Sequence, residues 1–232
     1  MGAVYLARNR LARHPSVALP IERVLRHGEV VDARTDIVIE GAPSSANSFA
    51  VAAFRAAQEP RPARVAHHTH APAQVIRAKR LGVPALVLIR EPEEAVLSLV
   101  VRTRSLTPVV ALRAWVWFYE SLLAHRESFV VGTFHEVVAD FGAVTRRVNE
   151  RFGREYGEFD HTEANVARII GEIETHQRTV HPQGRELERV IPRPSEVRNE
   201  LKREMRARYR EAPEALTARA GSLFDRLSES PP

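Results

Sequence analysis

The sequence predicts a three-layer α/β fold, in which a mostly parallel sheet carries helices on both faces and the last third is helical. Short apolar runs alternate with longer amphipathic stretches over residues 36–153, as in a parallel sheet with crossover helices. Residues 154–232 are more charged and show no strand pattern. With 232 residues, 44% of them hydrophobic, the chain fits a single domain, 1–232, with one sizeable core.

The elements follow from local patterns. Residues 1–35 lack a firm period and predict only a peripheral N-terminal helix or loop. Residues 36–40 are a β-branched run ended by Gly41 and Pro43, which predicts a buried strand, and a helix follows over 47–57. Residues 64–70 predict a second strand with a polar end. Pro72 then opens a helix that runs to about residue 81.

Residues 85–89, Ala-Leu-Val-Leu-Ile, give the strongest strand pattern of the chain, and a helix with one apolar face follows over 93–104. A second apolar helix over 108–125 leads to a fourth strand over 129–134 and a helix over 137–152. Beyond them we expect helices over 162–178, 195–210 and 213–227, an irregular connection at Pro182, Pro192 and Pro194, and a frayed tail from residue 228.

Composition restricts the function classes. The net charge of +5 and the pI near 10.2 suit an anionic ligand or partner. The excess of Arg over Lys favours bidentate phosphate contacts, although coding bias with solvated helix faces explains it equally well. The chain has no cysteine, which excludes disulfides, thiolate metal sites and cysteine nucleophiles. No apolar run approaches the ~18 residues of a membrane span, and the first apolar stretch is too short for a signal peptide, so we expect a soluble cytoplasmic protein.

Ligands of such a sheet bind beyond the carboxyl ends of the strands, so the polar strand ends at 41–48, 67–70, 90–92 and 134–136 are expected to converge on one crevice. The first of them, Gly41-Ala-Pro-Ser-Ser-Ala-Asn-Ser48, consists almost wholly of small residues, which lets a phosphate or sulfate approach the backbone and the helix end. In the nucleotide P-loop pattern, Ala46 and Asn47 stand where Gly and Lys belong. The sequence therefore argues against an ATP- or GTP-dependent phosphoryl-transfer enzyme.

Residues 42–49, Ala-Pro-Ser-Ser-Ala-Asn-Ser-Phe, resemble the 5′-phosphosulfate loop of sulfotransferases that use 3′-phosphoadenosine 5′-phosphosulfate (PAPS), usually Pro-(Lys or Arg)-Ser-Gly-Thr-Thr-Trp. The resemblance implies a bacterial sulfotransferase-like protein with a P-loop NTPase-like fold, whose PAPS-binding α/β core spans 36–153. It also implies that the sulfate donor is held by the whole loop: Pro43, Ser44, Ser45, Ala46, Asn47, Ser48 and Phe49.

Ser44 departs from the family pattern, because the family has a basic residue there that stabilises charge on the departing phosphate. Losing an electrostatic contact of that kind typically costs about 2.7 to 4 kcal/mol of transition-state stabilisation. An alternative follows from this substitution: a catalytically impaired sulfotransferase-like protein that binds the nucleotide or regulates another process.

Residues 87–98, Val-Leu-Ile-Arg-Glu-Pro-Glu-Glu-Ala-Val-Leu-Ser, resemble the family's 3′-phosphate motif. The motif places Arg at a strand end, Pro two residues later and Ser eight after the Arg. The resemblance implies that Arg90 forks onto the 3′-phosphate and that Ser98 donates its hydroxyl. By itself, an Arg-x-Pro is also an ordinary helix start.

His68-Thr-His-Ala-Pro72 is similar to the family's Lys-Thr-His-x-Pro segment. The similarity implies that His70 is the catalytic base for the acceptor and that His68, in the place of a second active-site Lys, is a weaker cation. Two other interpretations remain open: a fortuitous His-rich strand end, and a metal site formed by His67, His68 and His70. Weaker similarities suggest Phe134 or His135 as an adenine contact and Gly184-Arg185 as a basic loop over the 3′-phosphate.

The expected reaction is therefore sulfuryl transfer from PAPS, which leaves 3′,5′-adenosine bisphosphate (PAP), without a required metal. Its acceptor is a hydroxyl or amine of a small molecule, carbohydrate, lipid or peptide, and the oligomeric state stays open. Nucleic-acid binding is the competing function, through a basic helix with Arg198, Lys202, Arg203, Arg206, Arg208 and Arg210. Interleaved glutamates favour a solvated, salt-bridged helix there instead.

Overall fold

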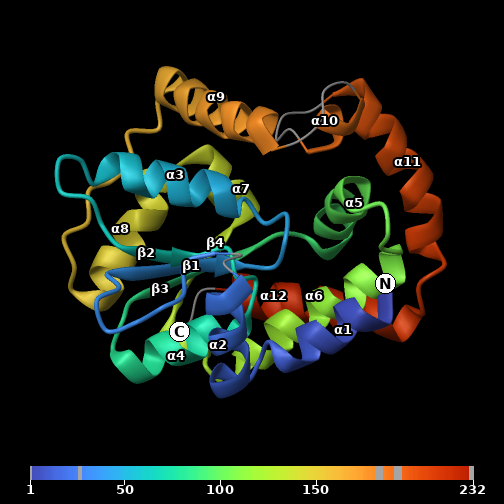
Figure 1. Ribbon diagram of the computed structural model, residues 1–232, viewed down its shortest axis with the longest axis horizontal. Helices are drawn as coiled ribbons and strands as arrows, with labels where there is room; N and C mark the ends of the chain where they lie inside the picture. Colours follow the sequence, from blue (N-terminus) through green and yellow to red (C-terminus); the bar gives the residue numbers. More distant parts are fainter. Residues whose placement is uncertain (1, 26–27, 181–184, 191–194, 230–232) are drawn as a thin grey trace.

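The computed structural model describes residues 2–25, 28–180, 185–190 and 195–229, and has three layers (Figure 1). The middle layer is a sheet of four parallel strands in the order β2-β1-β3-β4. These strands are β1 (Ile37–Gly41), β2 (Val65–His67), β3 (Ala85–Ile89) and β4 (Val130–Thr133). The predicted fold class is confirmed, including the helical C-terminal part.

Helices cover both faces of the sheet (Figure 1). One face carries α3 (Asn47–Ala57), α7 (Phe134–Ala139) and α8 (Phe141–Phe152); the other carries α4 (Pro72–Leu81) and α6 (Pro108–Leu123). The short 3₁₀ helix η1 (Arg126–Ser128) precedes β4, and α5 (Pro92–Arg102) lies beside the end of the sheet.

Each central strand supplies two hydrophobic cores, because alternate side chains point to opposite faces of a sheet. Ile39 and Leu88 belong to the core under α3 and α8, whereas Val38 and Val87 belong to the core over α4 and α6. All four are buried. A strand covered on both faces needs apolar residues at every position, which explains the unbroken apolar runs in the sequence.

Three predicted elements differ from the structure. The N-terminal segment forms two helices, α1 (Gly2–Leu11) and α2 (Pro15–Leu25), which pack on α6 and α4. Strand β2 ends at His67, because His68 has a left-handed backbone with φ of 58° and leaves the extended conformation. The helix expected over 137–152 is divided between α7 and α8 at Asp140, whose carboxylate accepts a hydrogen bond from the Ala143 N–H at 3.0 Å.

The C-terminal part consists of α9 (Glu163–Val180), α10 (Arg185–Val190), α11 (Glu196–Arg210) and α12 (Glu214–Ser228). Helix α11 packs on α5, and α12 packs on α6 and α5. The sequence did not predict α10, and the expected irregular connection at Pro182, Pro192 and Pro194 lies outside the described residues. None of the helices that the structure describes is long and apolar enough to cross a membrane.

Candidate functional site: a loop, an arginine cluster and three histidines at the strand ends

The loop between β1 and α3 turns through two left-handed residues, Ser44 and Ala46, with φ of 73° and 68°. Ala46 is the N-cap residue of α3 and stands where the resembled loop has glycine, the residue that adopts this conformation without steric cost. Gly41 opens the loop, and a Cβ at this position would lie 2.4 Å from the Leu88 carbonyl oxygen of β3. The neighbouring strand therefore requires glycine at the start of the loop.

The buried Tyr119 of α6 fastens this loop to the sheet. Its hydroxyl donates to the Leu88 carbonyl at 2.7 Å and accepts from the Ala42 N–H at 3.2 Å. Because that donation uses the single phenolic hydrogen, the Ser45 hydroxyl is the donor in its 3.2 Å contact with Tyr119. Asn47 closes the turn by donating to the Ala42 carbonyl at 3.0 Å. Tyr119 was not predicted from the sequence.

Arg90 follows β3 and reaches the loop. Its Nη1 donates to the Ser44 carbonyl at 3.3 Å, and its guanidinium carbon lies 3.9 Å from the ring centre of Phe134. Within the described part of the chain, the buried Arg90 Nε and Ser44 Oγ have no hydrogen-bond partner. Since buried polar atoms are nearly always paired, two unpaired atoms at this junction are consistent with a polar ligand bound there.

Ser98 lies on α5, the helix that follows Arg90, and is 5% exposed. Its hydroxyl accepts a hydrogen bond at 3.1 Å from Arg198 of α11, which is 8% exposed. Burial, and then the charges of Arg102 and Arg90, lower the pKa of Arg198 to about 10, so it is still a cation at neutral pH. Arg90, Ser98 and Arg198 thus form a basic cluster beyond β3.

The solvated character predicted for the basic helix α11 is wrong for half of its cationic side chains. Arg198 is buried, Lys202 lies 2.8 Å from Glu94 of α5, and Arg206 lies 2.6 Å from both Glu93 and Glu94. The three side chains that point toward α5 are spaced at positions 198, 202 and 206, which is one face of a helix. The interleaved glutamates of α11 do not make these ion pairs.

A chain of hydrogen bonds runs from Arg55 through two histidines to Ser48 of the loop. Arg55 can only donate, so it donates to His67 Nε2 at 2.9 Å, and His67 then carries its proton on Nδ1. His67 Nδ1 donates this proton to His68 Nδ1 at 2.6 Å. His68 therefore carries its own proton on Nε2, which donates to Ser48 Oγ at 3.1 Å. The hydrogen of the exposed Ser48 hydroxyl is therefore available to a ligand.

His68 is neutral in this arrangement. Burial, followed by the charges of Arg102 and Arg55, lowers the pKa of His68 to about 4, and burial lowers that of His67 to about 3. At neutral pH His68 is therefore not the weak cation expected at this position. No group of three or more metal-ligating side chains occurs among the described residues.

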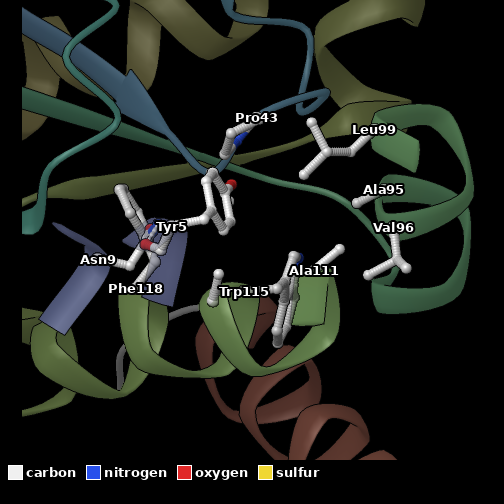
Figure 2. A pocket seen from close by; sticks show the side chains of 11 residues that line it. Tyr5, Asn9, Pro43, Ala95, Val96, Leu99, Ala111, Trp115 and Phe118 are labelled. Atoms are coloured by element: carbon white, nitrogen blue, oxygen red, sulfur yellow. Dashed lines mark hydrogen bonds between the residues drawn. The ribbon is translucent and has the colours of Figure 1, made fainter. Parts of the chain in front are cut away.

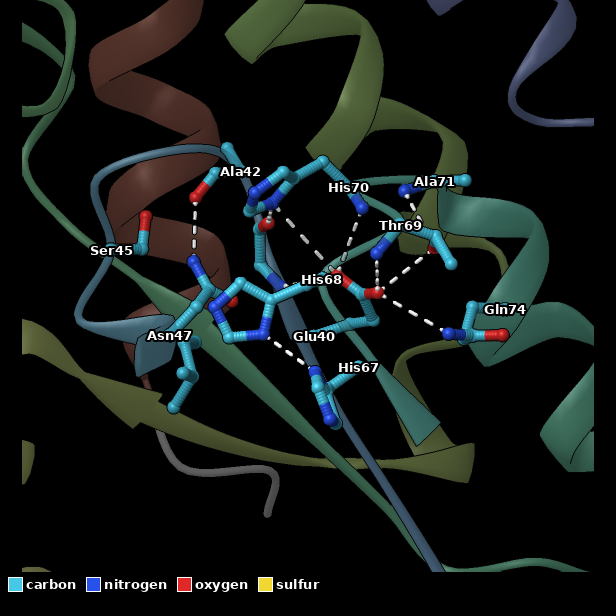
Figure 3. A network of polar contacts seen from close by, with 12 residues as sticks. Glu40, Ala42, Ser45, Asn47, His67, His68, Thr69, His70, Ala71 and Gln74 are labelled. Atoms are coloured by element: carbon cyan, nitrogen blue, oxygen red, sulfur yellow. Dashed lines mark hydrogen bonds and ion pairs between the residues drawn. The ribbon is translucent and has the colours of Figure 1, made fainter. Parts of the chain in front are cut away.

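One ring nitrogen of His70 is bonded to the end of β1 and the other is not (Figure 3). Its Nδ1 lies 2.8 Å from the Gly41 carbonyl oxygen, which can only accept, so Nδ1 carries the proton and Nε2 keeps a free lone pair. Nε2 makes no hydrogen bond to any described residue. Burial is the main cause that lowers the pKa of His70 to about 4, and the nearby charges of Arg102 and Arg8 act in the same direction.

Under this turn lies Glu40, a fully buried carboxylate at 0% exposure (Figure 3). It accepts hydrogen bonds from the Thr69 N–H at 2.7 Å, the Thr69 hydroxyl at 2.9 Å and the His70 N–H at 3.2 Å. Gln74 and the Gly41 N–H donate to it as well, each at 3.3 Å. Burial raises the pKa of Glu40 to about 7. The sequence reasoning missed Glu40, although an acidic residue inside an apolar strand was its signal.

Other predicted residues lie apart from this chemistry. Phe49 packs edge-on against Phe141 and Phe159, so its ring anchors α3 in the core. His135 is exposed and pairs with Glu91 at 3.1 Å. Gly184 lies outside the described residues, as does the side chain of Arg185.

A small apolar pocket adjoins the loop at Pro43 (Figure 2). Helices α1, α5 and α6 supply its other walls, with Tyr5, Leu99 and Trp115 among the lining residues. Its free volume is about 10 Å³, which is room for about one water molecule. Trp115 is buried, and its Nε1 donor has no partner among the described residues.

Among known proteins, only solved structures show similarity to the chain. No family model and no curated protein matches the chain. Among solved structures, the mouse sulfotransferase SULT7A1 complexed with PAP is similar over 84% of this chain and 89% of that one, with 13% sequence identity and a TM-score of 0.46. The fold and the site together define a three-layer α/β protein with a parallel sheet and a polar site at its strand ends.

Proposed function

We propose that this chain is a sulfotransferase that takes the sulfuryl group from PAPS and releases PAP. The observation that carries the proposal is the junction of Arg90 with the small-residue loop through the Ser44 carbonyl, at 3.3 Å. It joins two features suited to anions, a strand-to-helix loop and a guanidinium cluster.

In this proposal the loop from Pro43 to Phe49 holds the phosphosulfate, with Ser48 donating its free hydroxyl hydrogen. Arg90, Ser98 and Arg198 hold the 3′-phosphate. Arg198 is an addition to the residues that sequence motifs offer, and its 3.1 Å bond to Ser98 supports it. A dianionic phosphate between Arg90 and Arg198 would relieve the repulsion that now lowers the pKa of Arg198.

The proposed chemistry is an in-line displacement at sulfur. The acceptor oxygen or nitrogen forms a bond to sulfur while the bond from sulfur to the bridging phosphate oxygen breaks, and PAP leaves with that electron pair. His70 Nε2 takes the proton of the acceptor, and the Gly41 carbonyl holds the required tautomer by accepting from Nδ1. An anionic donor beside His70 raises its pKa toward neutrality, which improves it as a base.

The proposal assigns no acceptor to the apolar pocket beside Pro43, because its free volume of about 10 Å³ holds about one water molecule.

The second candidate function is nucleotide binding without turnover. Ser44 is neutral, its hydroxyl is unpaired, and His68 is neutral too, so neither supplies a cation to the bridging oxygen. If this candidate holds, Ser44→Lys leaves an acceptor panel unsulfated; if only the missing cation limits turnover, the same substitution raises it.

The test of the proposal is titration calorimetry with PAP. Arg90→Ala removes charge-assisted hydrogen bonds worth about 1.5 to 3 kcal/mol and weakens PAP binding roughly 10- to 150-fold. Arg146→Ala is the matched control, because Arg146 is an exposed arginine on α8 that pairs with Glu158. Failure of the wild-type protein to bind PAP, or equal binding by the Arg90 variant, overturns the site.

A further inference from the structure

Exposed aliphatic side chains are concentrated on the two N-terminal helices. Of the eight exposed large hydrophobic residues in the described part of the chain, six lie on α1 and α2: Val4, Leu11, Val17, Ile21, Val24 and Leu25. Val24 is 82% exposed and Val4 is 75% exposed. On α2 the positions 17, 21 and 24 share one helix face, while Ala18 and Leu19 are buried. Such a group on a surface marks an interaction site rather than scattered apolar residues.

The exposed charges on α1, α2, their connecting turn and α4 are all basic, and the nearby Glu120 of α6, which adjoins Arg10 and Arg13, pairs with Arg219. Helix α2 packs on α4, and α1, α2, their connecting turn and α4 contain seven basic residues: Arg8, Arg10, Arg13, Arg23, Arg77, Lys79 and Arg80. Their single acidic residue is Glu22, which is buried and lies 2.9 Å from Arg8. The exposed surface of these three helices is therefore aliphatic and cationic, without an exposed carboxylate.

We propose that α1 and α2 dock this protein on an anionic lipid surface. A helix with an aliphatic face and flanking arginines lies in the bilayer interface, where apolar side chains enter the acyl region and the cations meet lipid phosphates. A second copy of the chain fits less well, because a twofold contact would bring the two basic surfaces together. Nucleic acid fits less well, because it leaves the aliphatic side chains without an apolar partner.

The experiment is co-sedimentation with vesicles of phosphatidylcholine containing 30% phosphatidylglycerol, compared with pure phosphatidylcholine vesicles. The full chain binds the anionic vesicles more tightly, and binding weakens as salt is added. Arg10→Glu with Arg13→Glu reduces binding at least tenfold, since each basic residue contributes about fivefold. Arg203→Glu with Arg208→Glu, on the exposed side of α11, is the control and binds as well as wild type.

The apolar component is tested separately. Ile21→Glu with Val24→Glu abolishes vesicle binding, whereas Val180→Glu, at another exposed valine, does not. Val24→Gln alone reduces binding and cannot disturb the core, because that side chain is largely exposed. Thermal unfolding identical to wild type establishes that the variants are folded.

Three results overturn the inference: equal affinity for neutral and anionic vesicles, equal losses in the control variants, or sedimentation velocity showing a dimer that the Ile21 and Val24 variant dissociates. Tight binding to an RNA or DNA oligonucleotide that the same variant leaves intact would also overturn it. None of these measurements depends on PAPS.

Discussion

Replacing Glu40 by Gln changes how the stability of the protein depends on pH. The carboxyl of Glu40 has a folded-state pKa of about 7, raised by burial from 4.5. Between these two values the folded state keeps a proton that the unfolded chain has released. The stability contributed by this group is therefore complete below pH 4.5 and is lost as the pH rises to about 7.

The size of the effect follows from the shift. A change of about 2.5 pKa units corresponds to about 3 kcal/mol, at 1.36 kcal/mol per unit. Glutamine does not titrate, so Glu40→Gln gains about 3 kcal/mol relative to wild type between pH 4.5 and 7.5, on top of a constant offset from altered hydrogen bonds. His67, His68 and His70 have lowered pKa values and stabilise the protein as the pH rises toward 6.5, but this contribution is common to both proteins and cancels in the difference.

The assay is urea denaturation of both proteins at half-unit steps from pH 4.5 to 8. The control is Glu136→Gln. Burial raises the pKa of Glu136, but hydrogen bonds from Thr133 and Arg147 outweigh it and keep this pKa below its usual value. The stability difference between Glu136→Gln and wild type therefore does not change with pH above pH 5. A difference between Glu40→Gln and wild type that stays constant with pH, or that falls, refutes the reasoning about the buried carboxylate.

Three further predictions concern the loop and the basic cluster. Ala46→Gly stabilises the protein by about 0.5 to 1 kcal/mol in urea denaturation, because relief of about 1 to 2 kcal/mol of left-handed strain exceeds the entropy cost of glycine. The control Ala52→Gly, inside α3, destabilises the protein by about 1 kcal/mol. Arg198→Ala weakens PAP binding about tenfold or more in calorimetry, and an unchanged affinity removes Arg198 from the proposed site. Ser44→Lys raises sulfation across a panel of hydroxyl acceptors, followed as PAP release, and no gain favours the binding-only function.

The sheet and most of its helices could be predicted because their signals are local. The strand at 85–89 and the helices at 47–57 and 72–81 have the predicted bounds, since apolar runs, Pro72 and Gly82 mark their ends directly. The division at Asp140 was harder to predict, because the apolar pattern continues through it and only the backbone conformation of a single residue separates the two helices.

The candidate site was predictable only where its residues follow a strand. Arg90 and His70 stand at the ends of β3 and beyond β2, and strand ends of a parallel sheet meet at one edge. Tyr119 has no such marker: it lies on an apolar helix, and only the folded structure brings its hydroxyl to the Ala42 N–H, 77 residues away in sequence. Contacts of this kind depend on tertiary packing that no local pattern encodes.

Arg198 shows how a residue that resembles a solvated charge becomes part of a site. In the sequence it belongs to a helix with alternating charges, which ordinarily indicates a face in water. In the folded protein, Glu93 and Glu94 of α5 pair with Lys202 and Arg206 of α11. Lys202 and Arg206 lie one and two turns beyond Arg198 on the same helix face, so these ion pairs turn Arg198 toward Ser98. Glu94 also lies 3.6 Å from Arg90, so removing it would change both arginines of the basic cluster. Replacing Glu93 alone, which pairs with Arg206, would weaken PAP binding through the position of Arg198. The ion pairs between α5 and α11 thus position the basic cluster, and they also explain why half of the cations on this helix are not free to bind nucleic acid.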